Sequence, residues 1–393
     1  MKFDRNVTVF PTLLHREIYM KALRLVPPEV SLVEIEKTDP EMAASGREFY
    51  NFMLDLYGDM YCNPEAYGMT PGVYEAFAQY RKWRYMRLRV KEFHDNMEIS
   101  GVTISSYVKF INEIALYCYI TDGKCYLSYD DYKKVKDLKR VTFVHSQHLL
   151  LPIEYIMLAL QRVELYFRDD GEKIQVISEK YPNMFLSASA LRHAVEDTIN
   201  TPVSKKLKYF FGEYIDTLEF RLLQGIYYPN FEDQIRSLSD KDREAVIALD
   251  ALTKEYKLRP NYKASLLGYE YKYKGKPMLG VGTNNDSWFT EPNRKQNLWV
   301  RHVAVNISES SDPSYFDNIE KLGEDFKKYY MRHLPFCRAC TPYHTSGSAQ
   351  NVIFGKKVRL CSGYGGCISK FTVKDLPYIR KYIELYINGA SKE

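Results

Sequence analysis

Four cysteines gather in one short segment near the C-terminal end of the chain, and their spacing is suited to metal chemistry. Cys337 and Cys340 form a Cys-x-x-Cys motif, and Cys361 and Cys367 follow after twenty and then five intervening residues. Zinc takes four sulfur or nitrogen ligands in a tetrahedron, and a Cys-x-x-Cys turn presents two sulfurs to one side of the metal. The spacing therefore predicts a structural zinc site formed by these four thiolates, in which His344 could replace one ligand.

Two other readings of the same cysteines stay open. Cysteine is among the most buried residues even where it does no chemistry, so the four thiols could be free and partly buried. Cys337 and Cys340 could instead form a redox dithiol. A reactive Cys-x-x-Cys normally opens a helix, whereas Thr341 to His344 has the composition of a loop, which makes the redox reading the weakest of the three.

A β-hairpin is the element that would bring the second pair of cysteines back to the first. The sequence predicts strands over Asn351 to Phe354 and Lys357 to Leu360, joined by a turn at Gly355-Lys356. Such a turn would place Cys361 beside the Cys-x-x-Cys motif, as in a zinc ribbon. The five residues between the last two cysteines exceed the usual two to four, so the match to that pattern is imperfect.

A second group combines cations with aromatic rings between Tyr80 and Lys91. Arg81, Lys82, Arg84 and Arg87 could neutralise phosphates while neighbouring rings stack on bases, so they are candidate nucleic-acid contacts. On a helix these cations spread around much of the circumference instead of forming one stripe. We therefore favour a solvated helix that buries its aromatic residues and extends its long cations into water.

Signals for catalysis are weak. His145 and His148 lie three residues apart, but the local sequence lacks the glutamate of a His-Glu-x-x-His motif, and ordinary hydrogen-bonded histidines are commoner. The chain contains no phosphate-binding loop, no nucleophile elbow and no dinucleotide-binding glycine motif. No catalytic residue is predicted.

The pattern of apolar residues predicts an α+β fold in two domains. Residues 1–258 show helical spacing, with caps such as Asp39 before Pro40 and Ser239 before Asp242, and read as a mainly helical domain. Residues 259–393 read as a smaller α+β domain with antiparallel hairpins and the cysteine-rich module. Further helices are expected over 105–120, 152–167, 187–199, 206–223 and 312–331, and strands over 141–144, 174–177 and 298–307. A hairpin is expected from strands over 269–273 and 277–281, joined by a turn at Gly275-Lys276.

Composition limits the function classes. A net charge of +5 over 393 residues implies no obligatory polyanion partner, and 45% hydrophobic residues are ordinary for a globular protein. With no apolar leader and no long apolar span, we expect a cytoplasmic protein with reduced thiols. The favoured interpretation is a binding or interaction protein with a structural zinc site. Alternatives are an enzyme with a zinc- or thiol-dependent interdomain pocket and a nucleic-acid-binding protein.

Overall fold

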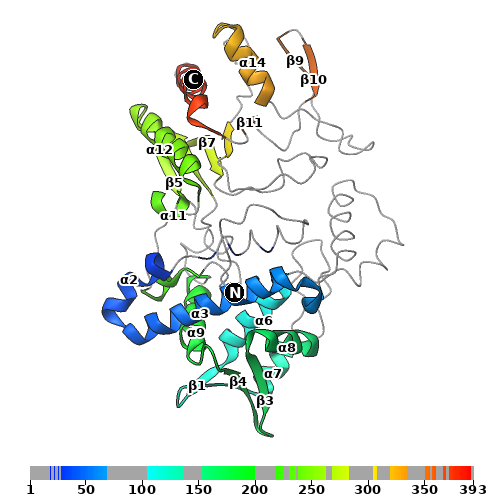
Figure 1. The fold of residues 1–393 in the computed structure, drawn as a ribbon. Helices are drawn as coiled ribbons and strands as arrows, with labels where there is room; N and C mark the ends of the chain where they lie inside the picture. Colours follow the sequence, from blue (N-terminus) through cyan, green and yellow to red (C-terminus); the bar gives the residue numbers. More distant parts are fainter. Residues whose placement is uncertain are drawn as a thin grey trace, which may run out of the picture. The chain divides into compact units, whose positions relative to one another are not determined.

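The computed structural model shows an α+β fold with a mostly helical N-terminal region and antiparallel sheets, as the sequence predicts (Figure 1). The chain divides into two compact units, and the change between them falls between Tyr228 and Pro229. The structure describes residues 18, 22, 25, 28–68, 104–136, 153–199, 218–224, 230–235, 238–262, 268–282, 304–307, 319–333, 350–354, 356–359, 366–368 and 371–390.

The first unit consists of helices packed beside a small sheet. Its helices are α2 (Pro28–Thr38), α3 (Pro40–Cys62), η1 (Pro64–Tyr67), α6 (Ile104–Tyr117), α7 (Tyr129–Lys136), α8 (Ile153–Leu160), η2 (Gln161–Val163), α9 (Met184–Ile199) and η3 (Phe220–Gln224). Its strands are β1 (Tyr119–Thr121), β2 (Lys124–Ser128), β3 (Leu165–Asp169) and β4 (Lys173–Ser178), in the spatial order β1-β2-β4-β3 and antiparallel throughout.

Helix α3 is the central element of this unit. It begins where the sequence predicts, because the Asp39 side chain accepts a hydrogen bond from the backbone N–H of Met42 at 2.9 Å and Pro40 occupies the first turn. Phe52 is completely buried, stacks on Phe49 and meets Tyr181 edge-on at 6.3 Å between ring centroids. Helices α2 and α9 both pack against α3, so this helix carries the core of the unit.

A carboxylate on α3 ties three segments together. Asp59 accepts hydrogen bonds from Tyr67 Oη at 2.7 Å, from Asn63 Nδ2 at 2.7 Å and from Arg162 Nε at 2.7 Å. Tyr67 lies in η1 and is fully buried, and Arg162 lies in η2. The backbone oxygen of Tyr67 in turn accepts a hydrogen bond from the buried Tyr107 hydroxyl. This network joins α3 to η1, η2 and α6.

The second unit is built on a five-stranded antiparallel sheet. Its strands are β5 (Arg259–Tyr262), β6 (Gly268–Tyr273), β7 (Lys276–Gly282), β8 (Ala304–Ile307) and β11 (Gly366–Ile368), in the order β11-β8-β7-β6-β5, and β9 (Gln350–Ile353) and β10 (Lys356–Arg359) form a separate hairpin. Its helices are α11 (Phe231–Ile235), α12 (Asp240–Glu255), α14 (Glu324–His333), η5 (Val373–Asp375) and α15 (Leu376–Ala390). Helices α12, α14 and α15 share one hydrophobic core with the sheet.

The predicted hairpin of the second unit is confirmed. Strands β6 and β7 are joined by Lys274 and Gly275, whose φ angles are 46° and 83°, and two such residues give the turn that fits the twist of a hairpin. The register shifts between Tyr271 and Lys272, which leaves Met278 as an extra residue in β7. Because of this bulge, Met278 and Leu279 are both buried although they are neighbours in the chain.

A prediction follows from Gly268 at the start of β6. A Cβ atom placed there would lie 2.7 Å from the carbonyl oxygen of Val281 in β7. Because the obstacle is backbone, Gly268→Ala must move one strand, and we expect it to lower the free energy of unfolding by about 1–3 kcal/mol. Urea unfolding followed by circular dichroism checks this. Val373→Ala serves as the control, because 41% of the Val373 surface is exposed and its truncation meets no backbone obstacle. Equal stability of Gly268→Ala and the wild type would refute the clash.

Three predicted element boundaries are wrong. The helix expected to reach residue 167 ends at Leu160, because Glu164 takes a left-handed conformation with φ 59° and Leu165 begins β3. The helix expected over 312–331 is interrupted: Ile319 and Glu320 are helical, the chain turns before Gly323 at φ 95°, and α14 begins at Glu324, while residues 312–318 lie outside the described residues. The helix expected to reach residue 120 ends at Tyr117.

Other predictions are confirmed or lie outside the described residues. Helices α9 and α12 and strand β4 lie where the sequence places them, and Ser239 accepts a hydrogen bond from the backbone N–H of Asp242 at 3.3 Å at the start of α12. The strand expected over 141–144 and most of the helix expected over 206–223 fall outside the described residues, and the described end of the latter is the short helix η3. The boundary at residue 258 stays a prediction. Among the described residues, no helix is both long and apolar enough to span a bilayer.

Candidate functional site

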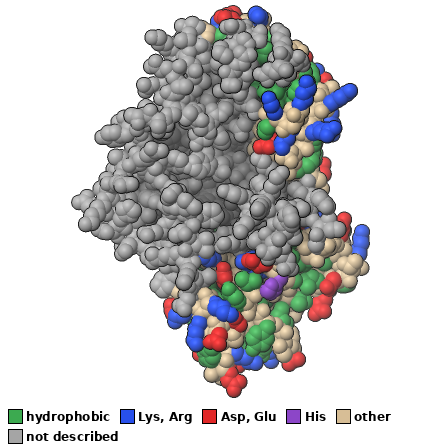
Figure 2. Space-filling model, turned by 180° about the vertical axis from the view of Figure 1, so that it is seen from behind, with side chains coloured by type: hydrophobic (Ala, Val, Ile, Leu, Met, Phe, Trp, Pro, Cys, Tyr) green, Lys and Arg blue, Asp and Glu red, His purple; other side chains and the backbone are tan. Residues whose placement is uncertain are grey.

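Exposed cations gather on the outer strands of the second unit's sheet. Arg259 lies in β5, Lys272 in β6 and Lys276 in β7, and Lys274 is in the turn that joins the last two strands. Lys257, at φ 55°, comes directly before β5. All are exposed except the half-buried Lys272. The space-filling view shows Lys and Arg side chains grouped on the described upper surface (Figure 2). We call Arg259 and Lys272, with their neighbours Lys257 and Lys274, the basic face; Lys276 is directly opposite Tyr273 and so projects to the other side of the sheet.

The pairing of the strands places two of these cations side by side. Arg259 and Lys272 are directly opposite each other in the antiparallel pair of β5 and β6. Residues opposite each other in such a pair project to the same face, and like charges there destabilise the pair. Alternation along β6 sends the buried Tyr271 to the core and Lys272 to the other face. The sheet thus holds two cations together on its outer face.

Glu270 lies two residues before Lys272 in β6 and projects to the same face, whereas two other nearby carboxylates are engaged elsewhere. Glu255 forms a two-bond ion pair with Arg380 of α15, at 2.6 and 3.1 Å, and this pairing lowers the pKa of Glu255. Asp250 accepts a hydrogen bond from the buried Tyr271 hydroxyl at 2.6 Å, and it forms an ion pair with Lys254. Within the part of the chain that the structure describes, Arg259 and Lys272 make no ion pair. Arg259 and Lys272 thus face each other without an ion pair among the described residues, with Glu270 as the neighbouring carboxylate on that face.

The structure describes the hairpin that lies between the two predicted pairs of cysteine ligands. The hairpin of β9 and β10 forms as predicted, with Lys356 paired to Ile353, so the turn begins after Ile353, one residue earlier than expected. Phe354 has a φ of 51°, and its ring is held on α14 by Tyr330, edge-on at 6.4 Å, and by the ammonium of Lys327 at 4.9 Å. These contacts anchor the hairpin tip to α14 (Figure 1).

Most of the predicted metal ligands lie outside the described residues. Cys367 lies in β11, paired with Asn306 of β8, and its side chain is not described. Cys337, Cys340, Cys361 and the alternative ligand His344 lie outside the described residues. Among the side chains that are described, no three of His, Cys, Asp or Glu are grouped to hold a metal. The zinc site therefore stays a prediction.

The candidate nucleic-acid contacts are also out of view. Arg81, Lys82, Arg84 and Arg87 lie outside the described residues, and the same holds for the histidine pair near residue 145. Sequence reasoning missed the basic face itself. The alternation of Tyr and Lys along β6 was visible, but the pairing of Arg259 with Lys272 depends on the register of β5, which no local pattern indicates.

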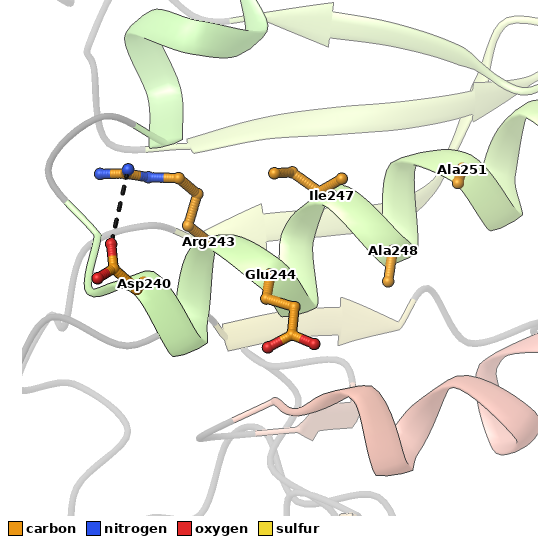
Figure 3. Close-up of a pocket in the computed structure, with 6 residues that line it drawn as sticks. All are labelled: Asp240, Arg243, Glu244, Ile247, Ala248 and Ala251. Atoms are coloured by element: carbon orange, nitrogen blue, oxygen red, sulfur yellow. Dashed lines mark ion pairs between the residues drawn. The ribbon is translucent and has the colours of Figure 1, made fainter.

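A shallow depression lies on α12. Its described lining comes from this helix alone, and the close-up shows the ion pair of Asp240 and Arg243, at 3.7 Å, beside Ile247 (Figure 3). The remaining lining residues are Glu244, Ala248 and Ala251, and the volume is about 440 Å³. A small apolar group could rest there. The described lining offers no set of converging polar groups, so it supplies no arrangement for catalysis.

Comparison with known proteins gives no family. No family model, no curated protein sequence and no solved structure matches this chain.

Proposed function

We propose that this chain is a binding protein whose second unit recognises an acidic segment of a protein partner through the basic face. The observation that carries the proposal is the cross-strand pair of Arg259 and Lys272. Two cations held opposite each other lower the stability of the sheet, and an anionic partner would relieve that repulsion. Lys257 and Lys274 extend the positive field around the pair.

The edge of the sheet favours contact through side chains. Strand β5 is an outer strand of the described sheet, and Pro260 in its middle has no backbone N–H to donate. A partner strand added along β5 would therefore meet an incomplete row of donors. The neighbouring Arg259 and Lys272 side chains remain available for carboxylates, so charge is expected to provide recognition.

A zinc ion held by Cys337, Cys340, Cys361 and Cys367 is the second part of the proposal. A two-stranded hairpin is marginal by itself in water, so the hairpin of β9 and β10 needs support beyond its own backbone pairing. Phe354 supports the tip, and the open end leads toward Cys361, two residues after β10. A metal that joins this end to Cys337 and Cys340 would stabilise the recognition unit.

Binding of poly-L-glutamate to the full chain tests the basic face. We expect Arg259→Glu to weaken binding about tenfold, equivalent to about 1.4 kcal/mol. The same substitution places a carboxylate opposite Lys272 and should raise the free energy of unfolding by about 0.2–1 kcal/mol, since opposite charges stabilise a cross-strand pair. A variant that binds less while it unfolds less readily cannot owe its weaker binding to damage to the fold.

The matched control is Lys133→Glu, which changes the net charge by the same amount in α7 of the first unit, where Lys133 pairs with Asp130. Equal losses in both variants would reduce the effect to net charge and overturn the proposal. Labelled single- and double-stranded DNA provides the comparison. Tighter binding to DNA than to poly-L-glutamate, falling steeply with salt, would replace the protein partner with nucleic acid.

Metal analysis of the purified full chain under reducing conditions tests the zinc site. We expect about one zinc per chain, with four thiols protected from alkylation until a chelator is added, assigned by mass spectrometry to the peptides of the four cysteines. Cys361→Ser should lose the metal, whereas Cys62→Ser, which alters an exposed thiol at the end of α3, should keep it. Three protected thiols would indicate an open coordination position and favour the enzyme alternative. No metal, with free labelling, would remove the site.

A further inference from the structure

The small sheet of the first unit has one buried face and one open face. Leu127 of β2 and Ile174 and Val176 of β4 are buried, and the ring of Phe167 in β3 meets Phe110 of α6 at 5.7 Å between centroids. Because side chains alternate along a strand, the residues between these project to the opposite side. That side, which we call the open face, carries ten side chains, and none of them is buried: Tyr119, Thr121, Lys124, Tyr126, Ser128, Tyr166, Arg168, Lys173, Gln175 and Ile177.

One row of the open face crosses all four strands in register. Tyr119 of β1 is directly opposite Tyr126 of β2, and Tyr126 is opposite Gln175 of β4. Gln175 is in turn opposite Arg168 of β3. The rings of Tyr119 and Tyr126 are stacked, with 5.7 Å between their centroids and 28° between their planes, and the ammonium of Lys173 lies 3.9 Å from the centroid of the Tyr126 ring. The row therefore sets two neighbouring rings, an amide and a guanidinium side by side across the sheet.

The most exposed rings of the open face lie on the two outer strands of the sheet. Tyr119 of β1 is 42% exposed and Tyr166 of β3 is 37% exposed, whereas Tyr126 lies between Tyr119 and Lys173. Three strand spacings of about 4.8 Å separate β1 from β3, so the two margins are roughly 14 Å apart. One extended ligand could therefore place a different flat group on each exposed ring.

The ten residues of the open face include three cations and no carboxylate. Lys124, Arg168 and Lys173 make no ion pair within the part of the chain that the structure describes. Asp169, at the end of β3, is opposite Ile174 of the buried face, and it accepts hydrogen bonds from the Tyr129 hydroxyl and from the backbone N–H of Gly171. The other nearby carboxylates lie beyond the strand ends, at Asp122, Glu164, Asp170, Glu172 and Glu179. The middle of the face is thus positive and aromatic.

We propose that the open face binds single-stranded nucleic acid. Exposed tyrosine rings stack on bases, while lysine and arginine neutralise the phosphates that join them. A four-stranded antiparallel sheet can stack two or three bases of a single strand on its aromatic side chains. A duplex keeps its base faces stacked on one another, so these rings could not reach them. An acidic peptide would engage the cations and leave the rings unmatched, so a single strand is the ligand that accounts for both.

Binding of labelled RNA and DNA strands of about 12 nucleotides and one mixed sequence to the full chain tests this proposal, since sites of this kind cover about 4–16 nucleotides. We expect at least one of the two strands to bind about tenfold tighter than its own duplex, with an affinity that falls as salt rises. Binding of each strand that is no tighter than binding of its duplex would overturn the proposal.

Ring substitutions test the stacking itself. Tyr119→Ala and Tyr166→Ala should each weaken binding of the single strand about tenfold, whereas Tyr119→Phe and Tyr166→Phe should bind like the wild type because they keep the ring. The matched control is Tyr155→Ala, which removes a ring of similar exposure, 36%, from α8 and should leave binding unchanged. Alanine variants that bind like the wild type, or phenylalanine variants that lose as much as the alanine variants, would refute stacking on these rings.

Charge substitutions locate the bound strand on the chain. Arg168→Gln should weaken binding and reduce the slope of log affinity against log salt by about one, since one phosphate contact is lost, whereas Lys37→Gln, which removes an exposed cation of α2, should change neither. Arg259→Glu alters the basic face in the second unit and should keep the single strand bound, so binding that persists in this variant has no bearing on the partner of the basic face. Loss of binding in Arg259→Glu, with Tyr119→Ala unaffected, would move the nucleic acid to the basic face and overturn the proposal.

Discussion

Phe52→Ala is expected to lower the free energy of unfolding of the first unit by about 3–5 kcal/mol, the largest effect of a single substitution proposed for this chain. The Phe52 ring is fully buried in α3, between Phe49 and Tyr181. Its removal forfeits the transfer energy of a whole aromatic side chain and leaves a cavity that the surrounding helices fill only in part. The core between α3 and α9 should lose most of its packing.

Hydrogen exchange resolved by mass spectrometry measures this effect in the first unit alone. Peptides of α3 and α9 should exchange faster in Phe52→Ala by the factor that corresponds to the lost free energy, while peptides of α12 and α15 should be unchanged. Leu158→Ala is the control, since 63% of the Leu158 surface is exposed on α8 and its loss should change little. An effect of the same size in both variants would contradict the packing argument.

Asp59→Ala is expected to lower the free energy of unfolding by about 2–3 kcal/mol. The substitution removes one carboxylate from three donors at once, and the Tyr67 hydroxyl, on a fully buried ring, is left without its acceptor. Arg162 is partly exposed and can turn to water, so Tyr67 should account for most of the loss. Asp59→Ala with Tyr67→Phe should be less destabilised than the sum of both single variants, because the unpaired hydroxyl is then absent.

The same carboxylate gives the first unit a pH dependence. Burial by itself would raise the pKa of Asp59, but hydrogen bonds from Arg162, Tyr67 and Asn63 outweigh burial and hold the pKa below its ordinary value. A carboxyl with a lower pKa in the folded state stabilises the fold above its unfolded pKa, about 3.9, and loses this contribution as the pH falls through the folded value. Asp59→Asn should show a flatter acid-side stability curve than the wild type, and an identical curve would contradict this.

The fold could be predicted wherever a local signal decides the structure. Asp39 with Pro40 and Ser239 with Asp242 satisfy backbone donors within one turn, and α3 and α12 begin at these residues. The glycine at 275 indicated the β6–β7 hairpin because it tolerates positive φ, although the turn is formed by Lys274 and Gly275, one residue earlier than expected. Local signals do not predict an element whose formation depends on pairing with a distant strand. Leu165 and its neighbours continue a helical apolar pattern, but they form β3 because β4 offers them backbone partners.

The candidate sites show the same division. The cysteine spacing can be recognised in the sequence because a metal site requires only a few residues of one type at short spacings. The basic face cannot be recognised in the sequence, because Arg259 and Lys272 lie opposite each other only when β5 pairs with β6 in one register. Non-local pairing is thus the information that single-sequence reasoning lacked.

The proline in β5 has a consequence for how this protein behaves at high concentration. An unpaired outer strand is a template on which identical chains can stack into fibrils. Pro260 interrupts that template, and Arg259 adds repulsion between any two copies that approach along it. The second unit can therefore present an open sheet margin in a crowded solution without seeding its own polymerisation.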